Sequence, residues 1–145
     1  MLKGLSPLLT ADLLHALRAM GHGDELAIVD ANYPAASMGW RLIELPGTTS
    51  PGVLAAVLSV FPVDTFETPA AISMEVVGDA AAVPAPVADF ARVFAAAGLG
   101  DIAIGPVERG AFYARARNAF AIVRTGELRP YGNILVVKGV INATP

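Results

Sequence analysis

The sequence of residues 20–35 is Met20-Gly21-His22-Gly23-Asp24-Glu25-Leu26-Ala27-Ile28-Val29-Asp30-Ala31-Asn32-Tyr33-Pro34-Ala35. Its four consecutive apolar residues, 26–29, lie between an acidic pair and Asp30, which is followed by a proline turn. A short apolar run without alternation is typical of a strand that is covered on both faces of its sheet. The stretch therefore predicts a buried strand whose carboxyl end carries Asp30, and ligands of open α/β sheets bind at such ends.

Helix and strand patterns alternate along the rest of the chain. Thr10 is a typical helix N-cap, and the apolar residues after it fall on one helical face. Ser50 followed by Pro51 predicts another N-cap, with proline at the first helical position. Two more helices are expected at 87–97 and 109–119, and five more strands at 41–45, 71–77, 102–104, 120–123 and 134–137. This alternation predicts an α/β fold, a single-domain (1–145) three-layer α/β/α sandwich with a mainly parallel sheet.

The composition excludes several classes of chemistry. The chain has no cysteine, which rules out disulfides, thiolate zinc sites and cysteine nucleophiles. Its two histidines, His15 and His22, are too few for an all-histidine metal site, so we expect neither a metal nor a cofactor. A net charge of −3 with ten basic residues provides no electrostatic footprint for nucleic acid.

Apolar residues make up 54% of the chain and charged residues only 16%, against about 25% charged in an average domain. The uncharged stretch 45–63 contains three prolines and two glycines, so it cannot form one membrane-spanning helix. Self-association is the simplest way to cover the excess apolar surface. Residues 1–7 lack the pattern of a signal peptide, and the cytoplasm is therefore the expected compartment.

The candidate functional residues suit acid-base work on a neutral polar molecule. Glycines flank His22 and leave its imidazole uncovered, and histidine as a residue type titrates near neutral pH. Asp30, Arg109, Tyr131 and Asn133 offer hydrogen-bond donors and acceptors from strand ends and loops. The sequence has no Gly-x-Ser-x-Gly elbow, phosphate loop or dinucleotide fingerprint, so covalent and nucleotide chemistry are poorly supported.

Each candidate also has a structural interpretation. His22 could be a solvated residue of a helix-terminating loop, and Asp30 could cap the proline turn that follows it. Arg109 could begin a helix at the surface, while Tyr131 and Asn133 could belong to a hairpin turn. A straight strand would also hold His22 and Asp30 on the order of 15 Å apart, at about 3.3 Å per residue. The two would meet only if the glycine-rich loop folds back or if a neighbouring chain supplies part of the site.

Several segments, in order, carry a family resemblance. They are Met20–Glu25, Asp30-Ala31, Pro34-Ala35, Ser37–Gly39, Ala111–Tyr113, Ala119–Val123, Thr125–Glu127 and Tyr131–Leu135. As an ordered set, they resemble the L-fucose mutarotase branch of the ribose pyranase/fucose mutarotase family. The similarity extends from near Ser6 to Gly139 and so covers essentially the whole chain.

The resemblance implies an isomerase that interconverts the anomers of a free monosaccharide without metal, nucleotide or covalent intermediate. It implies that His22 is the proton donor. It also implies that the sugar is bound by Asp30, Arg109, Tyr131, Gly132 and Asn133. Members of this family form ring-shaped oligomers with sites at subunit contacts, so the resemblance implies a ring-shaped homo-oligomer here, with a decamer as one candidate.

The resemblance leaves the substrate open. Gly23-Asp24, Arg109 and Gly132 favour L-fucose over ribose, whereas Asn32 and Ala36 stand where the fucose branch often has histidine. A D-ribose pyranase, which interconverts pyranose and furanose forms, is the alternative enzyme. A non-catalytic sugar-binding accessory of a transport system is the alternative from another class.

Overall fold

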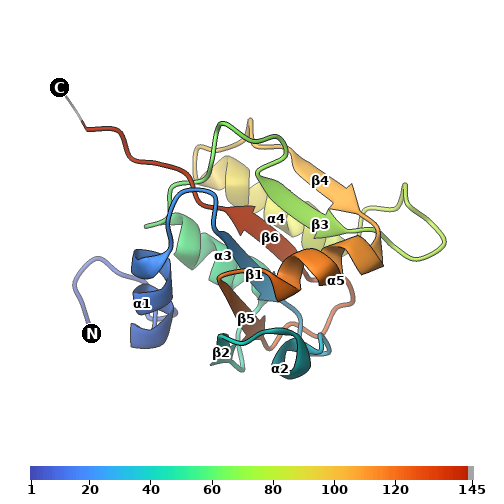
Figure 1. Ribbon diagram of the computed structural model, residues 1–145, viewed down its shortest axis with the longest axis horizontal. Coiled ribbons are helices and arrows are strands. Elements are labelled where there is room, and N and C mark those ends of the chain that lie inside the picture. The colour runs from blue at the N-terminus through green and yellow to red at the C-terminus, as the bar shows by residue number, and fades with distance from the viewer. Residues whose placement is uncertain (144–145) are drawn as a thin grey trace.

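A six-stranded sheet, in the order β2-β5-β1-β6-β3-β4, runs through the centre of the molecule (Figure 1). The computed structural model describes residues 1–143. The strands are β1 (Glu25–Val29), β2 (Leu42–Leu45), β3 (Ala71–Met74), β4 (Ile104–Val107), β5 (Ala121–Thr125) and β6 (Ile134–Val137). The expected strand at 26–29 is therefore confirmed as β1, which lies near the middle of the sheet.

The sheet is mixed, because one strand runs against its neighbours. β1 and β2 each pair in parallel with β5, and β3 pairs in parallel with β4. β6 is antiparallel to both β1 and β3, so three of the five pairings are parallel. The last two strands are joined by a loop but do not form a hairpin, since β1 lies between them. This reversal brings the start of β6 beside the end of β1, at the edge of the sheet that is formed by the carboxyl ends of the parallel strands.

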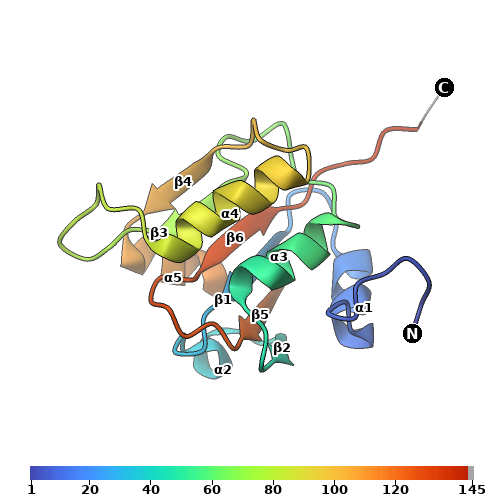
Figure 2. The same cartoon turned by 180° about the vertical axis from the view of Figure 1, so that it is seen from behind.

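Helices cover both faces of the sheet, which confirms the three-layer sandwich. The helices are α1 (Ala11–Ala19), α2 (Ala35–Met38), α3 (Ser50–Leu58), α4 (Ala85–Ala96) and α5 (Arg109–Arg117). Figure 1 shows α5 and the short α2 in front of the sheet, and Figure 2 shows α3 and α4 packed on the opposite face. α1 lies beside one end of the sheet and leads through a short loop into β1. The sequence patterns missed α2, which is only four residues long.

The central strands are buried on both faces. Every residue of β3 and β6 is buried, as are the four apolar residues of β1. From the helical layers, Leu54 of α3, Phe90 and Phe94 of α4, and Phe112 of α5 pack into the same core. Burial of this apolar surface, at roughly 25 cal/mol per Å² of apolar area, is what drives the layers together.

Several element boundaries differ from the predictions; the strand expected at 71–77, for example, ends at Met74, and two other differences have identifiable reasons. Thr49, not Ser50, is the N-cap of α3, because its extended backbone lets its hydroxyl accept the Gly52 N–H at 3.2 Å. Ser50 is instead the first helical residue and is fully buried. The strand expected at 102–104 is β4, which begins at Ile104 and includes Pro106. Proline is tolerated there because β4 is the outermost strand of the sheet, so one side of its backbone needs no hydrogen-bond partner.

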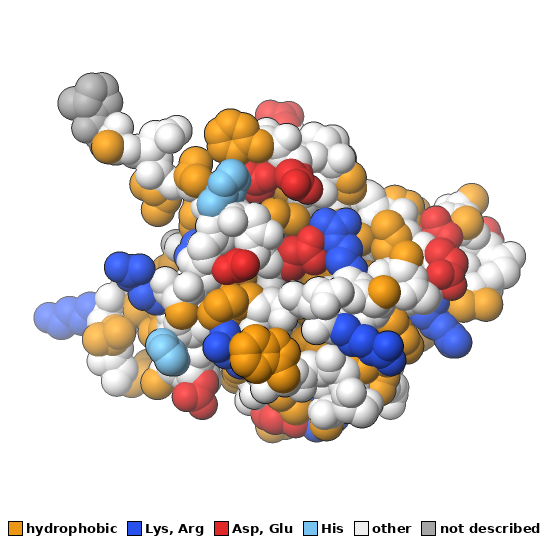
Figure 3. Space-filling view, in the orientation of Figure 1, with side chains coloured by type: hydrophobic (Ala, Val, Ile, Leu, Met, Phe, Trp, Pro, Cys, Tyr) orange, Lys and Arg blue, Asp and Glu red, His pale blue; other side chains and the backbone are white. Residues whose placement is uncertain are grey.

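Apolar side chains also reach the surface, where Figure 3 shows them scattered among charged groups on one face. Trp40 is 81% exposed, and Phe66 and Leu128 are also exposed. Both histidines reach the surface in the same view (Figure 3). Within residues 1–143, no helix has the length and apolar character needed to cross a membrane.

Candidate functional site

Asp30 and Asn133 form a reciprocal hydrogen-bonded pair at the edge where β1 ends. The antiparallel pairing of β1 with β6 places the end of one strand beside the start of the other, with Ile28 opposite Ile134. The Asp30 N–H donates to Asn133 Oδ1 at 2.9 Å, and Asn133 Nδ2 donates to Asp30 Oδ2 at 3.0 Å. Both side chains are buried, so the pair joins positions 103 residues apart in a fixed geometry.

The Asp30 carboxyl is held in an environment that disfavours its charge. Burial raises its pKa above the ordinary value of 3.8. Hydrogen bonds from the Asn32 N–H and from Asn133 favour the ionised form and offset part of that rise. A buried carboxyl with donors aimed at both of its oxygens is suited to accepting a hydroxyl proton or to orienting a hydroxyl group.

Tyr131 and Gly132 form the corner that leads into Asn133. Tyr131 adopts a left-handed backbone with φ +61°, which is uncommon for a residue with a side chain. Its hydroxyl accepts the Val77 N–H at 3.1 Å, which ties the corner to the loop after β3. A Cβ at Gly132 would lie 2.7 Å from Glu127 Cγ, so space requires glycine at this position.

Arg109 is the first residue of α5 and lies at the same edge of the sheet. Glu108 caps the helix by accepting the Gly110 and Ala111 N–H groups, at 2.8 and 3.2 Å. Arg109 lines a hollow of about 370 Å³ with residues 75–80, the loop that also holds the Tyr131 hydroxyl. The structure therefore gathers five of the six candidates, Asp30, Arg109, Tyr131, Gly132 and Asn133, along one edge.

Two tyrosines connect Arg109 with the segment after Asp30. The Arg109 guanidinium lies 5.8 Å from the centre of the Tyr113 ring, and that ring meets the Tyr33 ring edge-on at 5.1 Å. Tyr33 is buried, and burial raises the pKa of its hydroxyl to about 12. Its hydroxyl therefore stays protonated at neutral pH, and Tyr33 acts as a core residue.

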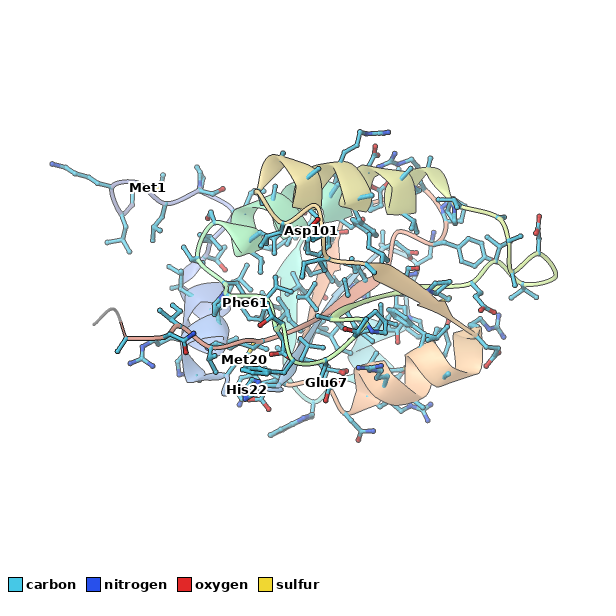
Figure 4. The ribbon with its side chains drawn as sticks, turned by 90° about the horizontal axis from the view of Figure 1, so that it is seen from above. Met1, Met20, His22, Phe61, Glu67 and Asp101 are labelled. Carbon is cyan, nitrogen blue, oxygen red and sulfur yellow. The ribbon has the colours of Figure 1, made fainter. Side chains whose placement is uncertain are left out.

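His22 lies at the opposite edge, before β1 begins. A five-residue strand spans about 16 Å, and β1 separates the imidazole from Asp30 within one chain. The His22 side chain is 49% exposed, and its ring meets the Phe66 ring edge-on at 5.5 Å. Figure 4 shows His22 on the same side of the molecule as Glu67, and its Nε2 is 3.1 Å from Asp64 Oδ1.

Asp64 is a functional candidate that the sequence patterns did not reveal. Its burial opposes ionisation, but hydrogen bonds from the Glu67 and Phe66 N–H groups and from His22 outweigh it and lower the pKa of Asp64. An ionised carboxylate can only accept, so His22 Nε2 donates to Asp64 and leaves Nδ1 for a bound molecule. The only signal in the sequence was a carboxyl directly after the uncharged stretch 45–63.

The Lys138-Gly139 segment holds the two halves of this pair together. Lys138 Nζ donates to the carbonyls of Leu17 and Met20, each at 2.7 Å, and so fixes the end of α1. The Lys138 carbonyl accepts the Gly23 N–H at 2.9 Å, beside His22. A Cβ at Gly139 would lie 2.6 Å from the Val63 carbonyl oxygen, so glycine allows the chain after β6 to approach the segment that carries Asp64.

Within the described part of the chain, no group of three or more histidine and acidic side chains is arranged to hold a metal ion. The structure presents an oriented imidazole where β1 begins and a cluster of hydrogen-bonding side chains where β1 ends. That combination is suited to proton transfer on a polyhydroxylated molecule.

The chain matches the model of the RbsD / FucU transport protein family over residues 3–141. It is 43% identical to the fucose mutarotase of Danio rerio over 145 residues, which cover 97% of this chain and 94% of that protein. It is 41% identical to the fucose mutarotase of Homo sapiens over 150 residues, which cover 99% of this chain and 97% of that protein.

A solved structure extends this similarity to the fold. The fucose mutarotase from Streptococcus pneumoniae, solved in complex with L-fucose, superposes with a TM-score of 0.90 at 37% identity. The similarity covers 97% of this chain and 100% of that one. Because the family model, the curated relatives and the fold all match over nearly the whole length, this chain belongs to the RbsD / FucU transport protein family.

Proposed function

We propose that this protein is a monosaccharide mutarotase that interconverts the α and β anomers of L-fucose. The observation that carries the proposal is the half-exposed His22 imidazole, oriented by the buried Asp64 carboxylate. It occurs in a chain that aligns over nearly its full length with two fucose mutarotases.

The chemistry needs one acid and one base. Ring opening delivers a proton to the ring oxygen while the anomeric hydroxyl loses its proton, and this breaks the bond between the ring oxygen and the anomeric carbon. Reclosure on the other face of the carbonyl reverses both transfers. His22 gives the proton of Nδ1 to the ring oxygen and takes it back on reclosure, while Asp64 holds the imidazole by Nε2. A solvent water accepts the proton that the anomeric hydroxyl loses and returns it on reclosure, while Asp30 orients a sugar hydroxyl. No bond between the sugar and the protein is formed at any stage.

Asp30, Arg109, Tyr131, Gly132 and Asn133 bind the sugar in this proposal. The Arg109 guanidinium presents several N–H donors, and residues 131–133 before β6 present both donors and acceptors, which suits neighbouring hydroxyls of a sugar. Their common location along one edge of the sheet supports the assignment.

A second copy of the chain completes the site. One chain holds His22 and the sugar-binding edge at opposite ends of β1, too far apart to contact one monosaccharide. A closed ring lets His22 of one subunit reach the sugar-binding edge of the next. The exposed Trp40, Phe66 and Leu128 provide apolar surface for such contacts. A ring-shaped homo-oligomer, with a decamer as one candidate, is the expected assembly, and the cytoplasm is the expected compartment.

Saturation-transfer NMR on equilibrated L-fucose tests the activity directly. We expect saturation of one anomeric proton to reach the other anomer in the presence of the protein, and to do so more slowly with D-galactose or D-ribose. Exchange between ribose pyranose and furanose forms without fucose exchange would instead identify a ribose pyranase. Binding without exchange of any sugar would identify a non-catalytic accessory.

A histidine pair provides a matched control. His22→Ala should abolish fucose exchange while leaving the assembly intact, because the loop carrying it is held by Lys138 and not by the imidazole. His15→Ala removes an exposed histidine of α1 and should exchange at the wild-type rate. Near-normal exchange by the His22 variant would refute its assignment.

Light scattering tests the shared site. The chain has a mass of 14.9 kDa, and we expect a particle several times that mass. A monomer with full activity would contradict a site that is built from two copies.

A further inference from the structure

Glu127, in the loop between β5 and β6, is a charged residue that is only 3% exposed. Its carboxylate accepts three hydrogen bonds from Arg129: from the backbone N–H at 3.0 Å, from Nε at 2.9 Å and from Nη2 at 2.9 Å. These contacts lower the pKa of Glu127 and raise that of Arg129, so both stay ionised at neutral pH. Glu127 is buried but the Arg129 side chain is 43% exposed, and such partly solvated ion pairs add little stability, which raises the question of what the pair positions.

The pair ties the loop to three other parts of the fold. Arg129 Nη1 donates to Asp89 Oδ2 on α4 at 2.7 Å. The Ser50 backbone, in the first turn of α3, faces the Glu127 carboxylate and contributes to lowering its pKa. The Glu127 carbonyl accepts the Ala31 N–H at 2.9 Å, directly after Asp30. Glu127 is thus the point where α3, α4 and the end of β1 meet the loop.

The sugar-binding corner rests on this side chain. A Cβ at Gly132 would lie 2.7 Å from Glu127 Cγ and 3.1 Å from Ser50 Oγ, so the backbone before Asn133 packs directly against both residues. Ser50 Oγ is buried and has no hydrogen-bond partner within the described residues, so it contributes packing and not a tether. The Tyr131 backbone, with φ +61°, is held in a conformation that persists only where the surroundings impose it.

We propose that Glu127, through Arg129, is the positioning residue that holds the Tyr131-Gly132-Asn133 corner against Asp30. It touches no substrate, and it acts by fixing the backbone that aims the Asn133 amide at the Asp30 carboxyl. The inference rests on the proposed function for its kinetic consequence, since that corner is where the sugar is expected to bind. Its structural consequence, the order of residues 126–133, is independent of any activity.

Glu127→Gln is the primary variant, because it keeps the size of the side chain but cannot accept both guanidinium N–H groups. We expect the KM for L-fucose to rise by about tenfold or more, since small displacements of positioning groups carry large kinetic penalties. We expect kcat to change less and the pH profile of exchange to keep its shape, because the His22–Asp64 pair lies at the other edge of the sheet. A role in stability alone would lower the Tm and leave the KM unchanged at temperatures well below the Tm.

Asp89 supplies a second variant and a matched control. Asp89→Asn weakens the outer contact of Arg129 and also the pair with Arg92, so we expect a change in the same direction but smaller than that of Glu127→Gln. Arg92 also pairs with Asp89, but within residues 1–143 no hydrogen bond or ion pair joins it to the loop that carries Glu127. Arg92→Gln should therefore leave the KM for L-fucose unchanged. If the Glu127 variant does not fold, the comparison of the Asp89 and Arg92 variants still decides the question.

Hydrogen–deuterium exchange mass spectrometry of residues 126–133 in the assembled protein provides the readout that needs no sugar. We expect faster exchange of this segment in Glu127→Gln than in the wild type and in Arg92→Gln. Wild-type exchange and a wild-type KM in both the Glu127 and Asp89 variants would overturn the inference. Absence of sugar exchange in the wild type, together with the expected deuterium uptake, would refute the proposed function and leave the positioning role standing.

Discussion

Replacing Asn133 by alanine removes both hydrogen bonds that join the start of β6 to Asp30. The Asp30 carboxyl loses a donor, and a hydrogen bond to a charged group contributes about 1.5–3 kcal/mol. The Asp30 N–H is left buried without a partner, which costs about 1–3 kcal/mol more. We therefore expect Asn133→Ala to lower the free energy of unfolding by about 3–5 kcal/mol and the Tm by about 10 °C.

The decrease in the free energy of unfolding that Asn133→Ala causes should depend on pH. Burial already raises the pKa of Asp30 above 3.8, so between that value and the raised pKa the folded state binds more protons than the unfolded state. Stability from this group therefore falls as the pH rises through that window. Without Asn133 the pKa rises further, because one hydrogen bond to the ionised form is lost. The destabilisation should be larger at about pH 7 than at about pH 4, where more of the carboxyl is protonated.

Urea unfolding followed by circular dichroism at both pH values measures the effect. The protein concentration must be held constant, since self-association would add to the apparent stability. Asn118→Ala is the matched control, because the Asn118 side chain is exposed and donates only to the Ala114 carbonyl; we expect its change to stay within about 0.5 kcal/mol. A loss below about 1 kcal/mol for Asn133→Ala, or an equal loss at both pH values, would refute the reasoning.

Three further predictions concern other contacts of the site. Lys138→Met removes the donors to the Leu17 and Met20 carbonyls, and it should lower the free energy of unfolding in urea by about 1–3 kcal/mol. It should also slow fucose exchange; unchanged exchange would show that the end of α1 does not position His22. Gly126→Ala would place a Cβ 2.6 Å from the Gly47 backbone nitrogen and should destabilise by about 1–3 kcal/mol, whereas Gly100→Ala meets nothing closer than 3.7 Å and should be neutral by calorimetry. Asp64→Asn should reduce the loss of stability that occurs at acid pH. Hydrogen bonds lower the pKa of Asp64 in the folded state, so in the wild type the stability that the ionised carboxylate contributes is lost as the pH falls below about 4. An acid unfolding midpoint equal to that of the wild type would contradict this interpretation.

Local patterns in the sequence predicted most of the elements. The apolar run 26–29 is β1, and residues 134–137 match β6, because strands buried on both faces need apolar side chains at every position. Thr10 was correctly predicted as an N-cap, since its hydroxyl accepts the Leu13 N–H. The error at Ser50 arose because two adjacent hydroxyl residues can both serve as caps, and only the packing of α3 decides between them.

The residues of the candidate site were likewise predictable from the sequence only in part. His22, Asp30, Arg109 and Asn133 could be named as candidates from the sequence, because they are polar residues in loops and next to the ends of the expected helices and strands. Asp64 was not readable, because its partner lies 42 residues away and no local pattern records the contact. The role of Glu127 was equally hidden, since it depends on α3, α4 and the turn after β1 all meeting residues 127–129, which no local pattern records.

By itself, the sequence determined the α/β class, the central buried strand and the kinds of chemistry available, because these follow from side chains and their spacing. Only the tertiary structure decided that β6 runs antiparallel beside β1. That pairing puts Asn133 against Asp30 at one edge and brings Lys138 and Asp64 to His22 at the other. The physical reason is that strand order and direction are set by long-range packing and hydrogen bonding, which local residue patterns do not encode.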